Sequence, residues 1–188
     1  MKIAIIGQGY VGLTISTFAA EHFEVVGFDS NQKIVDNLNL GISHIEGVQN
    51  SKLQSLIKSG KYNATTKGSD IQGSEIVVIA VPTPLTPDRK PDLSFIDAAC
   101  KTIGQNLSKP VLVINESTSF PGTLRSFIKT NMKSILQKWW SIHMRFHQRE
   151  STQAEMISIR RTPHVCFRDL LLRLPKKQGS FIPNFVTT

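Results

Sequence analysis

The sequence predicts a doubly wound α/β fold over residues 1–131, with a parallel sheet covered by helices on both faces. Short, continuously apolar runs alternate with segments of helical period, as expected for strands that are buried on both sides. A glycine-rich turn joins the first apolar run to the first helical segment. Eleven of the 12 glycines lie in this part of the chain, which is where such a fold needs its turns.

Each element follows from its local pattern. The strands are apolar runs that end at a turn residue: the first ends at Gly7, and the clearest, over 75–81, is followed by Pro82. The helices carry apolar residues on one face, and the helix over 31–40 ends at Gly41. The predicted strands cover 2–6, 25–28, 75–81 and 111–114; the predicted helices cover 11–20, 31–40, 53–57 and 94–107, and a further helix begins over 122–129.

Length and composition fit one domain, or a domain plus a fragment, with a hydrophobic core, since the chain has 188 residues of which 40% are hydrophobic. No run of about 18 apolar residues occurs, so a membrane span is not expected. The apolar start of the chain is interrupted at Gly7, which argues against a signal peptide. Two cysteines, Cys100 and Cys166, are too few for a disulfide scaffold and favour a cytoplasmic protein.

Charge divides the chain at about residue 131. Residues 1–131 hold 12 Lys+Arg and 11 Asp+Glu, whereas residues 132–188 hold 10 and 3 and so carry most of the net charge of +8. From residue 132 onward the sequence follows neither a strand period nor a helix period. We therefore expect one α/β domain over 1–131, incomplete at its C-terminal end, and a basic, disordered tail over 132–188 that is not a domain.

Gly7, Gly9 and Gly12 form a G-x-G-x-x-G motif that follows a strand, opens a helix and precedes a second strand. This context is typical of a Rossmann-type dinucleotide site. Gly7 permits the tight turn, Gly9 lets the main chain approach a pyrophosphate, and Gly12 lets helix and strand pack closely. The free N–H groups at the start of the helix attract phosphate oxygens. A glycine turn without a ligand is the alternative interpretation.

Asp29 closes the second predicted strand, 17 residues after Gly12. An acid near this spacing accepts hydrogen bonds from the adenosine ribose hydroxyls. A carboxylate there repels a 2′-phosphate, so NAD is favoured over NADP. Alternatively, Asp29, with Ser30 and Asn31, supplies a cap for the helix that follows.

Two further polar segments follow strands. One is V-P-T-P-L over 81–85, where the prolines restrict the chain beside the Thr83 hydroxyl; the other is N-E-S-T over 115–118, followed by P-G-T over 121–123. The carboxyl ends of parallel strands meet at one edge of a sheet, so both segments are expected beside the glycine loop. Either segment alone is also explained as turn chemistry.

Four ordered segments within residues 1–131 resemble the UDP-glucose/GDP-mannose dehydrogenases, the nucleotide-sugar 6-dehydrogenases. They are IAIIGQGYVGL, FDSNQKIVDNLNLG, IAVPTPLTPDRKPDLSFI and VINESTSFPGT. The V-P-T-P and E-S-T-x-x-P-G-T forms are most similar to the branch that acts on UDP-N-acetylhexosamines, with UDP-N-acetylglucosamine placed before UDP-N-acetylmannosamine.

The resemblance implies an oxidoreductase that takes the sugar C6 hydroxyl to an acid with two NAD, through an aldehyde and a cysteine thioester, for surface polysaccharide synthesis. It implies that Tyr10, Val11 and Asp29 hold the adenosine and pyrophosphate. Thr83 and Thr118 would contact the nicotinamide half, with Thr118 near the reacting carbon as a catalytic residue. The family's usual state is a homodimer, and no membrane, nucleic acid or metal ion is expected as a partner.

Two departures from the family pattern stand out. The basic residue that usually follows the acid by about five positions is Ile34 here, with Lys33 beside it. The P-E-R segment, the lysine and asparagine of the central helix and the nucleophilic cysteine are absent. Cys100 lies on an apolar helical face and is expected to be an inert buried thiol. The chain alone is therefore expected to be inactive, with UDP-sugar bound only by a full-length enzyme.

A shifted reading frame would explain the tail. The codons allowed for residues 137–164, read from the third nucleotide of each codon, permit a string that contains S-P-E-R-V-x-P-G, the segment that the family carries next. Our hypothesis is a frameshift near residues 132–136, either in the gene or in its reading.

Two other classes of function are compatible with the sequence. A stand-alone NAD-binding module would be folded and soluble, would bind NAD and would have no turnover. A nucleic-acid binder would use the basic tail, and its salt-dependent binding would vanish on deletion of residues 132–188.

Overall fold

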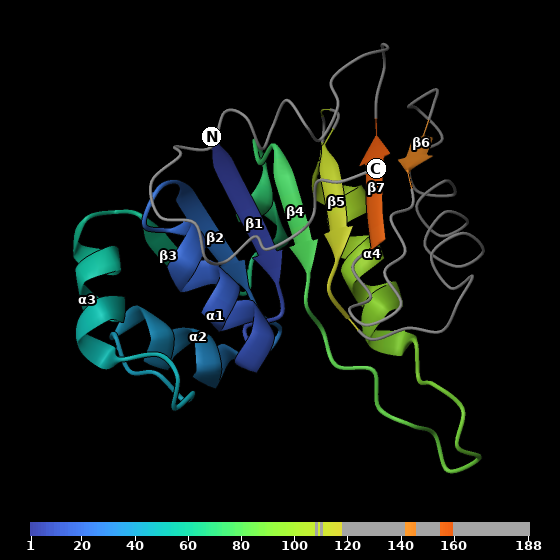
Figure 1. The fold of residues 1–188 in the computed structure, drawn as a ribbon, viewed down its shortest axis with the longest axis horizontal. Coiled ribbons are helices and arrows are strands. Elements are labelled where there is room, and N and C mark those ends of the chain that lie inside the picture. Colours follow the sequence, from blue (N-terminus) through green and yellow to red (C-terminus); the bar gives the residue numbers. More distant parts are fainter. Residues whose placement is uncertain (108, 110, 118–141, 146–154, 160–188) are drawn as a thin grey trace, which may run out of the picture.

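Five parallel strands form the centre of the fold. The structure is a computed structural model that describes residues 1–107, 109, 111–117, 142–145 and 155–159, the last two groups by their main chain. The strands lie in the order β3-β2-β1-β4-β5 (Figure 1). The chain therefore begins in the middle of the sheet, adds β2 and β3 on one side of β1, and then adds β4 and β5 on the other side. This order confirms the predicted doubly wound Rossmann-type sheet. The bounds are β1 Lys2–Ile6, β2 Glu24–Phe28, β3 Tyr62–Thr65, β4 Ile76–Ile79 and β5 Leu112–Asn115.

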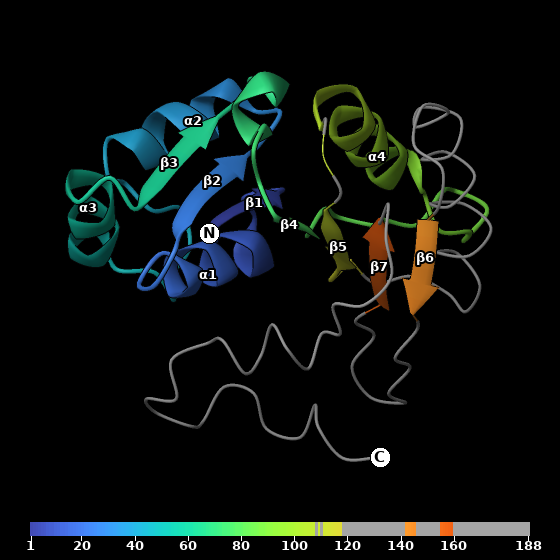
Figure 2. The same cartoon turned by 90° about the horizontal axis from the view of Figure 1, so that it is seen from above.

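Helices cover both faces of the sheet. One face packs against α1 (Tyr10–Ala19), α2 (Gln32–Asn39) and α3 (Asn50–Lys58). The other packs against α4 (Ser94–Asn106) and the short 3₁₀ helix η1 (Gly68–Ile71). Figure 2 shows α1 and α4 on opposite sides of the sheet.

The two faces of β1 contribute to separate parts of the core. Ile3 and Ile5 pack toward α1, whereas Ala4 and Ile6 pack toward α4. Because successive side chains of a strand point to opposite faces, a strand that is covered on both faces must be apolar at nearly every position. This is why β1 and β4 could be predicted from continuous apolar runs.

The strands and helices predicted within the described residues are present, with ends shifted by up to about three residues. β3 and η1 were not predicted from the sequence. β3 has four residues at one edge of the sheet, and Asn63 within it is exposed, so it carries no continuous apolar run. The predicted helix that begins over 122–129 lies outside the described residues.

Two antiparallel strands extend the sheet beyond β5. β7 (Glu155–Ile159) pairs with β5, and β6 (Ile142–Arg145) pairs with β7. The sequence did not predict these two strands, because residues 132–188 follow neither a strand period nor a helix period. The free edge of β5 presents unpaired N–H and C=O groups, which an extended segment can satisfy whatever its hydrophobic period. The rest of the predicted tail lies outside the described residues, as does the proposed frameshift boundary.

Cys100 lies in the core on α4 as a free, buried thiol. Burial raises its pKa to about 12, and the charge of Asp97 adds a smaller rise. A thiol that stays protonated at neutral pH is a poor nucleophile, which agrees with the inert role expected for it. Within the described part of the chain, no helix has the length and apolarity to cross a bilayer.

Candidate functional site

The glycine loop lies between the end of β1 and the start of α1. Gly7 has a φ of +92°, and a Cβ there would lie 2.6 Å from the main-chain oxygen of Ala80. Gly12 is buried in the first turn of α1, where a Cβ would lie 1.8 Å from the main-chain oxygen of Gly7. Any side chain at either position would therefore meet main-chain atoms, so the fold itself requires both glycines.

Gly9 is different, because its surroundings are open. Its main chain is extended, with φ −71° and ψ −163°, and a Cβ there would have no atom within 4 Å. Neither main-chain strain nor crowding within the described residues explains a glycine here. The open space above Gly9 is what a pyrophosphate would need in order to approach the main chain.

The start of α1 is left available to a ligand. Gly9 is the N-cap, so no side chain caps this end, and the first turn holds no acidic residue. Tyr10 and Val11 are exposed, although both are large apolar side chains. The uncapped N–H groups and the positive end of the helix dipole suit an anionic group such as a phosphate.

Asp29 lies directly beside the glycine loop, at the end of β2. Its Oδ2 accepts a hydrogen bond of 2.8 Å from the main-chain N–H of Gln8, and its Oδ1 accepts one of 2.9 Å from Asn31. A carboxylate has about four acceptor positions, so others remain for ribose hydroxyls. The cap of α2 is Asn31, whose side chain accepts from the main-chain N–H of Lys33. The capping role that was the alternative for Asp29 therefore belongs to Asn31.

Ile34 occupies the position where the resemblance led us to expect a basic residue, and its role in this chain is structural. Ile34 is partly buried and packs against the core on the α1 face, and Lys33 is exposed. Ile34 supplies apolar packing and cannot supply the charge.

The segments that hold Thr83 and Thr118 are joined by a side chain that the sequence analysis did not single out. Ser117 Oγ accepts from the main-chain N–H of Val81 at 2.9 Å and donates to the main-chain oxygen of Val81 at 2.8 Å. Ser117 is buried, and Thr83 is half-buried two residues beyond the junction. Thr118 lies outside the described residues, so its nicotinamide contact and catalytic role stay predictions. The only sequence signal for Ser117 was its place within E-S-T.

The predicted segments meet at one edge of the sheet. The N–H of Gly7 donates to Phe28 at the end of β2, and the N–H of Ala80 donates to Ile6 at the end of β1. The glycine loop, Asp29, the segment with Thr83 and Ser117 thus follow the carboxyl ends of four neighbouring strands, β1, β2, β4 and β5. This is the edge at which doubly wound sheets bind their ligands.

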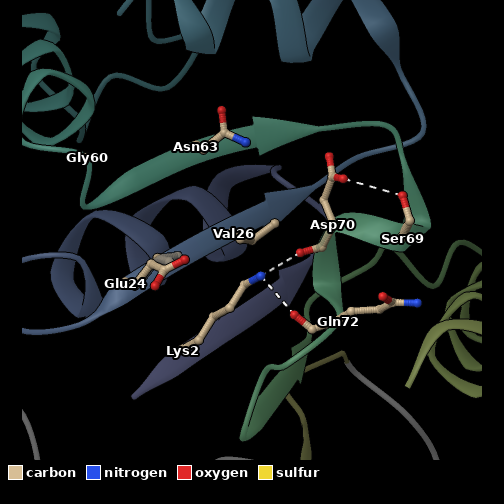
Figure 3. Close-up of a pocket in the computed structure, with 9 residues that line it drawn as sticks. Lys2, Glu24, Val26, Gly60, Asn63, Ser69, Asp70 and Gln72 are labelled. Carbon is tan, nitrogen blue, oxygen red and sulfur yellow. Dashed lines mark hydrogen bonds between the residues drawn. The ribbon is translucent and has the colours of Figure 1, made fainter. Parts of the chain in front are cut away.

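A groove of about 340 Å³ lies elsewhere, on the face that carries η1, at the amino ends of β1 and β2 (Figure 3). Lys2 Nζ donates to the main-chain oxygens of Asp70 at 2.8 Å and Gln72 at 2.9 Å, so its charge already has partners. The groove is at the opposite edge from the glycine loop and takes no part in the candidate site.

Comparison with known proteins shows the family of this chain. Residues 1–148 match the model of the NAD-binding domain of the UDP-glucose/GDP-mannose dehydrogenase family. The chain is 38% identical to the UDP-N-acetyl-D-mannosamine dehydrogenase of Pyrococcus horikoshii over 125 residues, which are 65% of this chain and 30% of the relative. It is 40% identical to the Salmonella typhi enzyme of the same name over 119 residues, 62% of this chain and 28% of the relative.

Solved structures show the same likeness. A UDP-N-acetylmannosamine dehydrogenase from Pyrococcus horikoshii superposes with a TM-score of 0.67 at 33% identity, over 73% of this chain and 33% of that one. A GDP-mannose dehydrogenase from Pseudomonas aeruginosa, solved as a ternary complex, gives 0.64 at 27% identity over 72% and 32%. The chain thus spans about a third of the length of the relatives it matches.

Proposed function

The chain belongs to the UDP-glucose/GDP-mannose dehydrogenase family through its NAD-binding domain, and from that premise we propose that it serves in oxidising the C6 hydroxyl of a UDP-N-acetylhexosamine to a uronic acid. The observation that carries the NAD-dependent part of this proposal is the contact of 2.8 Å between the glycine loop and Asp29. It unites the two halves of the dinucleotide motif in one site.

The residues present fit NAD. Gly9 leaves room for the pyrophosphate, and the uncapped start of α1 offers it N–H donors. Asp29 would accept from the adenosine ribose hydroxyls and would repel a 2′-phosphate. Thr83 and Thr118 would orient the nicotinamide half. When bound, NAD accepts a hydride, which is the chemistry that the protein side chains lack.

For the sugar, UDP-N-acetylmannosamine is the first compound to test. The sequence forms placed UDP-N-acetylglucosamine first, whereas the two relatives described above carry the name of UDP-N-acetyl-D-mannosamine. Both sugars remain within the proposed substrate class. Activity in surface polysaccharide synthesis, a homodimeric whole enzyme and a cytoplasmic location are further parts of the proposal.

We also propose the frameshift as the origin of residues 132–188. Cys100 is ruled out as the thioester nucleophile by its burial, and Cys166 lies outside the described residues. A protein encoded by the restored frame would supply the expected nucleophile and sugar-binding residues. The 188-residue chain would then bind NAD without turnover, as a stand-alone NAD-binding module also would.

The test compares two proteins, the 188-residue chain and the product of the gene with its frame restored. Each is incubated with NAD and either UDP-sugar, and NADH and uronic acid are measured. We expect two NADH per sugar acid from the restored protein and none from the shorter chain. A restored protein that is folded and binds NAD, yet oxidises neither sugar, would overturn the proposed substrate class. An alternative frame that does not encode the S-P-E-R segment would overturn the frameshift.

A further inference from the structure

The side chain of Gln8, the residue between the first two glycines of the loop, is fully buried. Its amide nitrogen donates to the main-chain oxygens of Ile5 at 3.0 Å and Gly7 at 3.2 Å. Its Oε1 accepts from Ser16 Oγ at 3.0 Å and from Tyr62 Oη at 2.9 Å. Both amide hydrogens and both oxygen lone pairs are therefore used. A polar group that is buried and fully paired holds one position, because any movement leaves a partner unsatisfied.

The neighbouring strands are shaped to hold this amide. Gly27 lies beside Ile5 in the register of β1 and β2, and a Cβ at Gly27 would lie 2.6 Å from Gln8 Cδ and 2.8 Å from Tyr62 Oη. The absence of a side chain at Gly27 thus leaves the space in which the amide and the phenol meet. Burial, and to a lesser degree the charge of Asp29, raises the pKa of Tyr62 well above its usual range. The phenol accordingly keeps its proton and remains a donor.

Gln8 also orients Asp29, the residue predicted to bind the adenosine ribose. The main-chain N–H of Gln8 donates to Asp29 Oδ2 at 2.8 Å, while Asn31 donates to Oδ1. The side chain of Gln8 is bonded to β1, to α1 through Ser16 and to β3 through Tyr62, so its main chain has little freedom to rotate. The direction of the N–H, and with it the orientation of the carboxylate, is set before any ligand arrives.

We propose that Gln8 is a positioning residue for the adenosine ribose of NAD: its buried amide, anchored by Tyr62 and Ser16, holds the Asp29 carboxylate ready to accept from the ribose hydroxyls. The inference rests on the proposed role of Asp29. An acceptor that is already oriented loses less conformational freedom on binding, which strengthens binding without adding a contact to the ligand.

The test measures NAD affinity by isothermal titration calorimetry of the 188-residue chain and its variants. A second titrant is the NAD analogue whose adenosine ribose lacks both the 2′- and the 3′-hydroxyl. Tyr62→Phe removes one donor to Gln8 and keeps the ring in the core. We expect it to raise the Kd for NAD about fivefold and the Kd for the analogue without these hydroxyls less than twofold. Gln8→Leu should have the same selectivity and a larger effect, about twentyfold on NAD.

Ile103→Val is the matched control, because Ile103 is a fully buried residue of α4, on the other face of the sheet. It should lower the unfolding temperature without changing either Kd. If Tyr62→Phe lowers the unfolding temperature and leaves both Kd values unchanged, or raises them equally, Gln8 has only a structural role and the inference is overturned. The result for Tyr62→Phe decides the question alone, so the inference can be overturned even if Gln8→Leu does not fold.

Asp29→Asn separates the inference from its premise. If this variant binds NAD as the parent does, the proposed role of Asp29 is wrong and the inference falls with it. If Asp29→Asn weakens NAD binding and Tyr62→Phe does not, only the inference about Gln8 fails. If both weaken it, adding Tyr62→Phe to Asp29→Asn should give no further loss, because the carboxylate that Gln8 orients is already gone. A further loss in the double variant would contradict the inference.

Discussion

Replacing Gly9 with alanine should abolish most NAD binding while leaving the fold intact. The main chain at Gly9 is extended, and an added methyl group would have no neighbour within 4 Å, so the folded chain accommodates it. Alanine is a poorer N-cap than glycine, which should cost about 1 kcal/mol at most. The methyl group would occupy the space proposed for the pyrophosphate. We expect the Kd for NAD to rise at least about a hundredfold, or about 2.7 kcal/mol.

Gly12→Ala is the matched comparison within the same motif. Its methyl group would lie 1.8 Å from the main-chain oxygen of Gly7, so helix and loop cannot both keep their places. We expect destabilisation of more than about 4 kcal/mol, in the range reserved for severe core disruption. Urea unfolding and calorimetric NAD titration of both variants distinguish the two roles. The proposed roles of the two glycines are wrong if Gly9→Ala binds NAD like the parent, or if it destabilises the chain as much as Gly12→Ala.

Three other predictions follow from single groups. Asp29→Asn should weaken NAD binding about tenfold and leave NADP binding unchanged or improved, because the charge that repels a 2′-phosphate is removed; equal losses for both, measured by calorimetry, would contradict this. Ser117→Ala should cost about 1–2 kcal/mol in urea unfolding, because the N–H of Val81 loses its acceptor, and should weaken NAD but not ADP-ribose, which lacks the nicotinamide. The pKa of Cys100 is raised to about 12 in the folded chain, so the unfolded chain loses this proton first as the pH rises. The free energy of unfolding should therefore fall between about pH 9 and pH 12. The free energy of unfolding of Cys100→Ala should fall less over the same range.

The central strands could be predicted because both of their faces are covered. β1 and β4 are apolar at nearly every position, and that pattern has no other common explanation in a chain with helical segments between the runs. β3 was not predicted because an edge strand needs no such apolar run, and its four residues include the exposed Asn63. β6 and β7 were not predicted because their place is set by pairing with the main-chain groups of β5 rather than by a hydrophobic period of their own.

The candidate site likewise contains residues that could be predicted from the sequence and residues that could not. Gly7, Gly9, Gly12 and Asp29 were found because their roles depend on spacing within one β-α-β unit. The roles of Gln8 and Ser117 depend on partners far along the chain. Gln8 meets a phenol 54 residues away, and Ser117 meets a main-chain group 36 residues away. No local pattern carries such pairings, and they become visible only once the strands are placed side by side.

The most direct test of the proposed NAD site is a calorimetric titration of the 188-residue chain with NAD and, separately, with NADP. We expect one NAD site per chain and an affinity for NAD at least about ten times that for NADP, since Asp29 is the proposed acceptor for the adenosine ribose hydroxyls. A chain that shows the circular dichroism of a folded α/β domain, yet gives no heat with NAD or prefers NADP, would contradict it.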